Sequence, residues 1–132
     1  MSIQIDKVQP KTKEQLKQLI NYAFKHNIYD LNFIDTSKIT DMSWLFENVK
    51  HNFDISSWDV SNVKDMSYMF QFCYDLNCDL SGWDVSNVTN TKYMFACCEK
   101  FNCELLNWNV SNVTSMRRMF DGCNKLTIPD WY

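Results

Sequence analysis

Polar and hydrophobic residues alternate in short runs that recur along the chain. Two of these runs cover residues 52–56 and 77–81 and read N-F-D-I-S and N-C-D-L-S. Because successive side chains of a strand point to opposite faces, Phe53 and Ile55 would lie on a buried face and the polar residues on an exposed one. Each run therefore predicts a short, half-buried strand.

A second hydrophobic pattern follows a different period. Its blocks cover residues 42–46, 66–70, 91–95 and 116–120; two of them read M-x-x-M-F, and the other two, M-S-W-L-F and T-K-Y-M-F, are close variants. Apolar residues at positions i, i+3 and i+4 share one face of a helix. We therefore expect a short helical turn in each block, on the side opposite the strands.

Both patterns belong to an internal repeat of about 25 residues. Trp58, Trp83 and Trp108 are 25 residues apart, each opens a W-[DN]-V-S-N-V segment, and a degenerate copy covers residues 34–39. A fixed period of this length is typical of a solenoid, in which each coil covers the apolar face of its neighbour. Equivalent strands would then stack about 4.8 Å apart in a parallel sheet.

The segments at the two ends do not follow the repeat. Residues 12–15 read T-K-E-Q, which matches a capping box, and an apolar stripe with helical spacing follows at residues 16–24. We expect this helix to cover the first coil, the alternative being a helix on a membrane surface. Alternation at residues 2–7 predicts an additional strand, and Trp131 and Tyr132 are expected to fold over the last coil.

We therefore expect one domain in three parts. Residues 1–28 form a strand and a capping helix, residues 29–128 form four repeats, and residues 129–132 form a C-terminal cap. The length of 132 residues is that of one domain.

Charge and composition exclude several classes of function. Thirteen Lys and Arg against sixteen Asp and Glu give a net charge of −3 without basic clusters, which argues against nucleic-acid binding. Two glycines exclude a glycine-rich phosphate loop. The longest apolar run, residues 93–98, is far shorter than the roughly 20 residues of a membrane span. Without a secretory signal pattern, a cytoplasmic location with reduced thiols is favoured.

The repeat resembles that of the BspA-like leucine-rich-repeat family, whose pattern is W-D-V-S-N-V-T-x-M-x-x-M-F-x-x-C. Residues 83–89, residues 93–95 and Cys98 match that pattern closely. The resemblance implies a short right-handed solenoid related to leucine-rich repeats, without catalytic residues. For some members it implies adhesion at a bacterial cell surface or binding to host proteins, so it also leaves a cell-surface location open.

Five of the six cysteines fall on two repeat positions. Cys78 and Cys103 share a position that holds Phe53 in an earlier copy, which indicates an apolar core position. A zinc site is disfavoured because the Cys-x4-Cys spacing is wide and the two histidines lie outside the register. Disulfides between coils stay open, since equivalent Cα atoms would be about 5 Å apart. We expect no metal and no cofactor.

Further rows of equivalent residues are expected to be structural. A serine nucleophile is disfavoured because the repeat places no base beside the serines. The tryptophan row has a second interpretation as a platform for stacking sugars. The expected structural rows are Trp58, Trp83 and Trp108; Asn62, Asn87 and Asn112; Phe46, Phe70, Phe95 and Phe120; and Cys73, Cys98 and Cys123.

The exposed side of the predicted strands is the candidate binding face. Its acidic residues recur once per coil, between asparagines and serines, and a regular polar stripe is how solenoids present a binding surface. A merely solvated face is the alternative, and a calcium site is disfavoured because a linear row does not converge on one ion. The residues of this interaction face are Asn52, Asp54, Ser56, Asn77, Asp79, Ser81, Asn102 and Glu104.

These patterns predict a non-enzymatic interaction module. Its partner would be a protein with a basic patch, or else a glycan. The alternatives are a purely structural repeat protein without a fixed ligand and, less favoured, an enzyme that uses the thiols or a metal.

Overall fold

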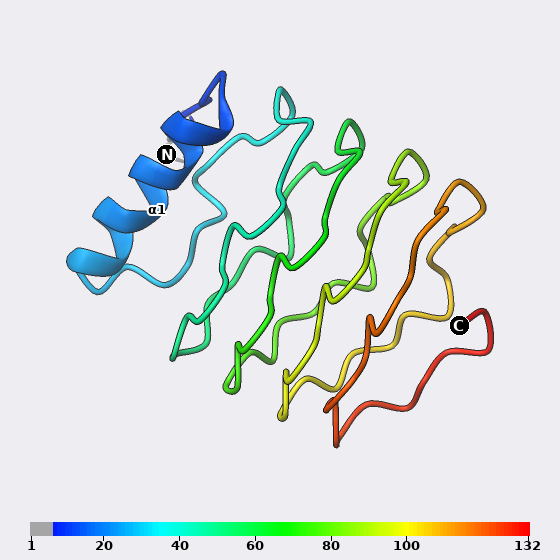
Figure 1. The fold of residues 1–132 in the computed structure, drawn as a ribbon. Coiled ribbons are helices and arrows are strands. Elements are labelled where there is room, and N and C mark those ends of the chain that lie inside the picture. The colour runs from blue at the N-terminus through cyan, green and yellow to red at the C-terminus, as the bar shows by residue number, and fades with distance from the viewer. Residues whose placement is uncertain (1–6) are drawn as a thin grey trace, which may run out of the picture.

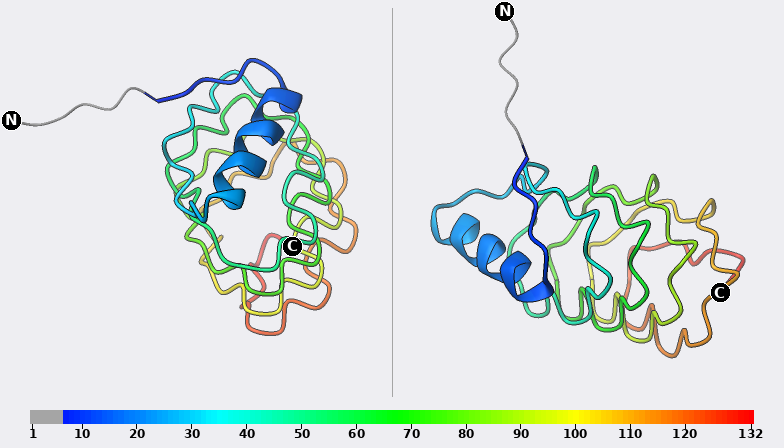
Figure 2. Two further views of the ribbon diagram at one scale, coloured as in Figure 1. Left: turned by 90° about the vertical axis from the view of Figure 1, so that its left-hand side faces the viewer. Right: turned by 90° about the horizontal axis from the view of Figure 1, so that it is seen from above.

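The structure is a computed structural model that describes residues 7–132 (Figure 1). It is a mostly irregular domain with one N-terminal helix, α1 (Lys13–Lys25), and extensive long-range contacts. After α1, successive circuits of the chain, here called coils, lie side by side along one axis, and they overlap when seen end-on (Figure 2). The strand predicted over residues 2–7 lies outside the described residues, apart from Lys7.

Backbone hydrogen bonds join the coils at four equivalent segments. These turn blocks cover residues 41–48, 65–72, 90–97 and 115–122. In the first three blocks, alternate N–H groups donate to carbonyls 23 or 24 residues later, as Phe46 donates to Met69 over 2.9 Å and Phe70 to Met94 over 2.9 Å. Parallel bridges connect the first residues of neighbouring blocks. The turn blocks therefore form one continuous parallel ladder.

The helical turns predicted in these blocks are wrong. Trp44, Tyr68 and Tyr93 have φ values of 64°, 59° and 55°, whereas an α-helix requires φ near −60°. Within residues 7–132 the only helix is α1. The spacing i, i+3, i+4 is met instead by a tight turn that buries residues such as Met42 and Phe46. In the first three blocks alternate N–H groups donate to the next coil, and the N–H groups of residues such as Leu45 and Met69 donate to the carbonyl three residues earlier in the same block, as in a tight turn.

The predicted strands alternate in burial but barely pair. Phe53 and Ile55 are buried and Asp54 is exposed, as the alternation predicts. A parallel bridge joins Asp54 to Asp30. Among the described residues, however, no backbone–backbone hydrogen bond joins residues 52–56 to residues 77–81. The parallel ladder lies at the turn blocks, not along the predicted strands.

The core lies inside the coils and is built of stacked aromatic rings. The rings of Phe46 and Phe70 are 5.8 Å apart, those of Phe70 and Phe95 5.3 Å, and those of Phe95 and Phe120 5.8 Å, all close to parallel. Each equivalent side chain therefore packs against its copy in the neighbouring coil, which keeps the coils in register.

The helix α1 covers the first coil, and its start is the predicted one. Thr12 Oγ1 accepts a hydrogen bond from the Gln15 N–H at 3.1 Å, which caps the helix. Leu16, Ile20 and Ala23 are buried, and the ring of Phe24 lies 5.8 Å from that of Phe53. Within the described residues, no helix is both long and apolar enough to cross a bilayer.

The C-terminal residues pack on the last coil. The Trp131 ring stacks on Trp108 at 6.4 Å, and its indole N–H donates to the Leu105 carbonyl at 2.9 Å. The ring of Phe120 contacts both Trp131 and Tyr132. These two residues cover the apolar end of the core.

Candidate interaction face

The structure exposes all eight residues of the interaction face. They come from three consecutive coils, because each coil contributes the outward positions of one predicted strand. The apolar residues between them point into the core and fix the direction of the polar side chains. The face is therefore a stripe of asparagines, carboxylates and serines that runs along the stack.

Much of the polar capacity of this face is used locally. Asp54 Oδ1 accepts hydrogen bonds from the N–H and the hydroxyl of Ser56, at 2.9 and 2.7 Å, and Asp79 does the same with Ser81, at 3.0 and 2.6 Å. These bonds lower the pKa of both carboxyl groups. The carboxylates are therefore charged at neutral pH, while the serine hydroxyls are engaged. In the third coil of this face, the residue two positions after Glu104 is Leu106 rather than a serine.

The same turn occurs on a second side of the coil. Asp59 binds the N–H and hydroxyl of Ser61, and Asp84 those of Ser86, with distances between 2.5 and 3.0 Å. The D-x-S pattern alone is therefore a turn-forming device rather than a sign of binding.

Shallow hollows lie along the interaction face, between its carboxylates. One of about 170 Å³ lies between Asp54 and Asp79. The next, of about 300 Å³, lies between Asp79 and Glu104. A third, of about 210 Å³, extends from Glu104 to the apolar side chains of Leu106 and Ile128. The first two hollows lie where the coils are not joined by backbone hydrogen bonds.

The sulfur atoms replace some of the missing backbone bonds. Cys78 Sγ accepts from the Ile55 N–H at 3.4 Å, and Cys103 Sγ from the Leu80 N–H at 3.3 Å. Asn52 adds a similar contact, because its Oδ1 accepts from the Asn77 N–H at 2.9 Å. The coils on this side are thus held together largely by side chains.

The other cysteine row donates to the backbone of the preceding coil. The thiols of Cys73, Cys98 and Cys123 donate to the carbonyls of Phe46, Phe70 and Phe95, each at 3.0 Å. Burial raises the pKa of Cys73 and of Cys123 to about 12, and it also raises that of Cys98.

All six cysteines are free, and Cys97 alone among them is not buried. No three or more His, Cys, Asp or Glu side chains come together as a metal site within residues 7–132.

We expect one fast-reacting thiol in the folded protein. At pH 8, Cys97 should react with a thiol reagent such as DTNB within seconds. The five buried thiols should react at least a hundredfold more slowly, because burial blocks access and the raised pKa values disfavour the thiolate. The Cys97→Ser variant should lose the fast phase, and guanidinium should release the remaining thiols. Two or more fast thiols in the native protein would contradict this arrangement.

The tryptophan and asparagine rows lie in structural positions. The indole N–H groups of Trp58, Trp83 and Trp108 donate to backbone carbonyls of the preceding coil at 2.9–3.2 Å, and each side chain is 4% exposed. This burial leaves no ring face free to stack on a sugar. The side-chain amides of Asn62, Asn87 and Asn112 donate to serine carbonyls of the preceding coil at 2.6–2.8 Å.

One surface feature was missed by the sequence reasoning. The rings of Trp44 and Tyr68 stack at 3.9 Å, and those of Tyr68 and Tyr93 at 5.0 Å, in a row on the outside of the turn blocks. Trp44 is 45% exposed. The signal was the aromatic residue at the same place in three blocks, but the helical interpretation considered only the apolar residues at i, i+3 and i+4.

Comparisons with known proteins leave the chemistry of this face open. No curated protein and no solved structure shows a significant match to the chain. A family described as "Mycoplasma protein of unknown function, DUF285" matches residues 14–131, which include most of α1 and all four turn blocks. The chain therefore belongs to the DUF285 family.

Proposed function

We propose that this chain is a short right-handed solenoid of the leucine-rich-repeat kind that works as a non-enzymatic protein-binding module. Support for the architecture comes from the regular spacing of the hydrogen bonds between turn blocks and from the resemblance to BspA-like repeats. Repeat proteins of this shape use extended surfaces, built from equivalent positions of successive coils, to hold partners.

The observation that carries the proposal is the succession of hollows on the interaction face. At about 170–300 Å³ they fall at or below the lower end of the range for small-molecule sites, about 300–1,000 Å³. A site of this size suits single side chains of a partner better than a whole ligand. The flanking carboxylates of Asp54 and Asp79 favour a cationic side chain, since arginine forms strong paired hydrogen bonds with a carboxylate. We therefore expect the partner to present several arginine or lysine side chains in a row.

A purely structural role is the second candidate. It is favoured by the bonds of Asp54 and Asp79 to their own serines, because Asp59 and Asp84 form the same turns on another side of the coil. This likeness also provides a matched control, since replacing any of these aspartates removes the same turn.

Charge reversal on the two rows distinguishes the candidates. We expect the Asp54→Lys/Asp79→Lys variant to bind an oligo-arginine peptide at least tenfold more weakly than the native protein, because two attractive charges become repulsive. Fluorescence anisotropy at low and at physiological salt measures the dissociation constant, and binding to the native protein should weaken with salt.

The Asp59→Lys/Asp84→Lys variant is the control. It makes the same change in net charge and loses the same kind of turn, so it should retain most of the affinity. If both variants lose affinity equally, binding reflects net charge alone and the interaction face has no special role. If neither variant loses affinity, the structural role is favoured.

A further inference from the structure

The ladder of turn blocks ends in an edge with unpaired donors. In the third block, the N–H groups of Thr91, Tyr93, Phe95 and Cys97 donate to carbonyls of the fourth block at 2.6–2.9 Å. The equivalent N–H groups of the fourth block have no acceptor within residues 7–132. The carbonyl of Thr114 likewise has no donor among these residues. We call residues 114–122 the donor edge. The N–H groups of this edge that lack the partners of their third-block equivalents are those of Met116, Arg118, Phe120 and Gly122.

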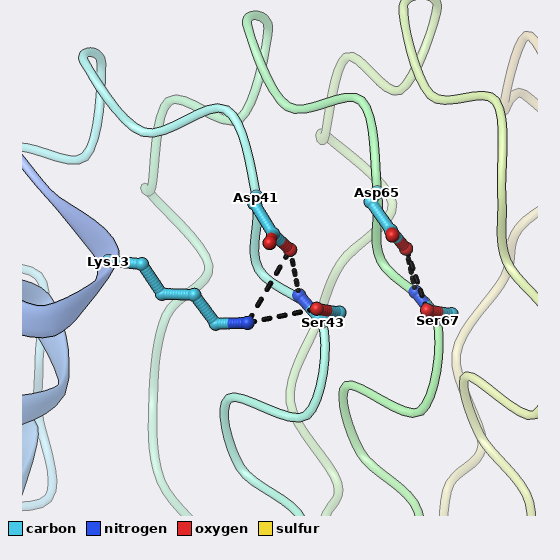
Figure 3. Close-up of polar contacts among 5 residues, drawn as sticks. All are labelled: Lys13, Asp41, Ser43, Asp65 and Ser67. Atoms are coloured by element: carbon cyan, nitrogen blue, oxygen red, sulfur yellow. Dashed lines mark hydrogen bonds and ion pairs between the residues drawn. The ribbon is translucent and has the colours of Figure 1, made fainter.

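The opposite end of the ladder is partly covered by α1. Lys17 Nζ donates to the Leu45 carbonyl at 2.7 Å, and Lys13 Nζ reaches Ser43 Oγ at 2.9 Å and Asp41 at 3.5 Å (Figure 3). Burial against this edge lowers the pKa of Lys17. The helix thus supplies cations to the carbonyl side of the ladder, where no coil precedes the first block within residues 7–132.

Among the residues that the structure describes, none covers the donor edge in a comparable way. Trp131 and Tyr132 pack on the ring of Phe120 but donate nothing to the edge and accept nothing from it. The edge also contains no proline, which is a common means of blocking unwanted strand pairing. The apolar core is therefore closed at this end, while the backbone remains available to a further segment.

The side chains of the edge indicate which segment fits. Arg117 and Arg118 are both exposed. Arg118 occupies the place of Trp44, Tyr68 and Tyr93 in the outer row and shares their left-handed backbone, with φ at 51°. Arg118 Nε lies 3.7 Å from Asp121 Oδ2 in an exposed ion pair, which is weak enough for a partner's carboxylate to replace. A guanidinium plane at the end of an aromatic row can also stack on one further ring.

We propose that the donor edge binds an extended acidic segment of a partner protein, with an aromatic side chain placed over Arg118. Carbonyl groups of the segment accept from the four unpaired N–H groups, and one of its N–H groups donates to the Thr114 carbonyl. This is addition of one strand to an exposed edge, a common mode of peptide recognition. The edge is distinct from the interaction face, so neither proposal depends on the other.

The first turn block provides the sequence of a suitable probe peptide. A peptide of residues 39–49 carries Asp41 and Glu47, has no basic residue and contains Trp44. In the register of the existing ladder, the carbonyls of residues 41, 43, 45 and 47 would accept from the donor edge, and Trp44 would lie over Arg118. With blocked termini, this peptide presents the predicted charges and ring.

The test follows individual amide protons in the full chain by NMR. In the free protein, the N–H groups of Met116, Arg118, Phe120 and Gly122 should exchange with solvent at least tenfold faster than those of the second block. The peptide should slow all four by at least tenfold, because it supplies acceptors for them. The intervening N–H group of Arg117 should change little.

Charge variants of peptide and protein separate this site from non-specific binding. A peptide with Asp41→Lys and Glu47→Lys should lose at least tenfold in affinity for the native protein. The Arg117→Glu/Arg118→Glu protein should lose its affinity for the unmodified peptide, but it should bind the peptide that carries Asp41→Lys and Glu47→Lys. The Lys125→Glu protein carries a charge reversal on an exposed residue outside the edge and should behave as the native protein does.

Three outcomes would overturn the proposal. The first is peptide binding that leaves the four amide protons unprotected, and the second is no binding at millimolar peptide. The third is protection of these protons by raising the protein concentration alone, which would assign the edge to a second copy of the chain.

Discussion

Replacing Phe70 with alanine is expected to lower the free energy of unfolding by about 3–5 kcal/mol. Phe70 is fully buried, and its ring contacts Phe46 on one side and Phe95 on the other. Truncation would leave a cavity that neither neighbour can fill without leaving the coil register. Because a small domain is typically stable by only about 5–15 kcal/mol, this single change would remove a large part of the total.

Urea denaturation followed by tryptophan fluorescence measures this loss. The control is Tyr74→Ala, which also removes an aromatic ring, but one that is 36% exposed and contacts Lys50. The control should cost less than about 1 kcal/mol, as surface substitutions usually do. Equal losses in the two variants would mean that the aromatic stack does not hold the coils together.

The second large effect is expected at the helix that covers the first coil. Ile20→Asp should destabilise the protein by about 4 kcal/mol or more, since it removes a buried side chain and places an unpaired charge in the core. Ile20 is 1% exposed. Without a well-docked α1, the apolar residues of the first coil, including Leu31 and Phe46, would face water.

The neighbouring position gives the matched control. Asn21→Asp introduces the same charge into the same turn of α1, but Asn21 is exposed. It should leave the unfolding midpoint and the elution volume in size-exclusion chromatography almost unchanged from those of the native protein, whereas Ile20→Asp should unfold or aggregate. Identical behaviour of the two variants would show that α1 is dispensable as a cap.

Both effects depend on features that were visible in the sequence. The recurrence of phenylalanine in the M-x-x-M-F blocks indicated residues that stack on their own copies. The T-K-E-Q segment at residues 12–15, followed by an apolar stripe, predicted α1 almost to the residue. Likewise, alternation predicted that Asp54 and Asp79 would be exposed and Phe53 buried. These features are local or strictly periodic, so a single sequence encodes them directly.

The conformation of the turn blocks could not be predicted in the same way. The spacing i, i+3, i+4 requires only that three side chains reach one face, and a helical turn and the observed tight turn both satisfy it. The left-handed backbone of Trp44 and Tyr68 is unfavourable for such bulky residues taken alone. It is held by hydrogen bonds to residues 23 or 24 positions away, which no local pattern reveals.

The sequence by itself determined the period, the alternation of burial and the capping helix, because each follows from spacing along the chain. Only the tertiary structure decided where neighbouring coils exchange backbone hydrogen bonds. That choice opens hollows between the coils at Asp54 and Asp79, and it leaves the N–H groups of Met116 and Arg118 unpaired. The physical reason is that a parallel ladder depends on the distance and orientation between coils, which are set by packing across the whole stack.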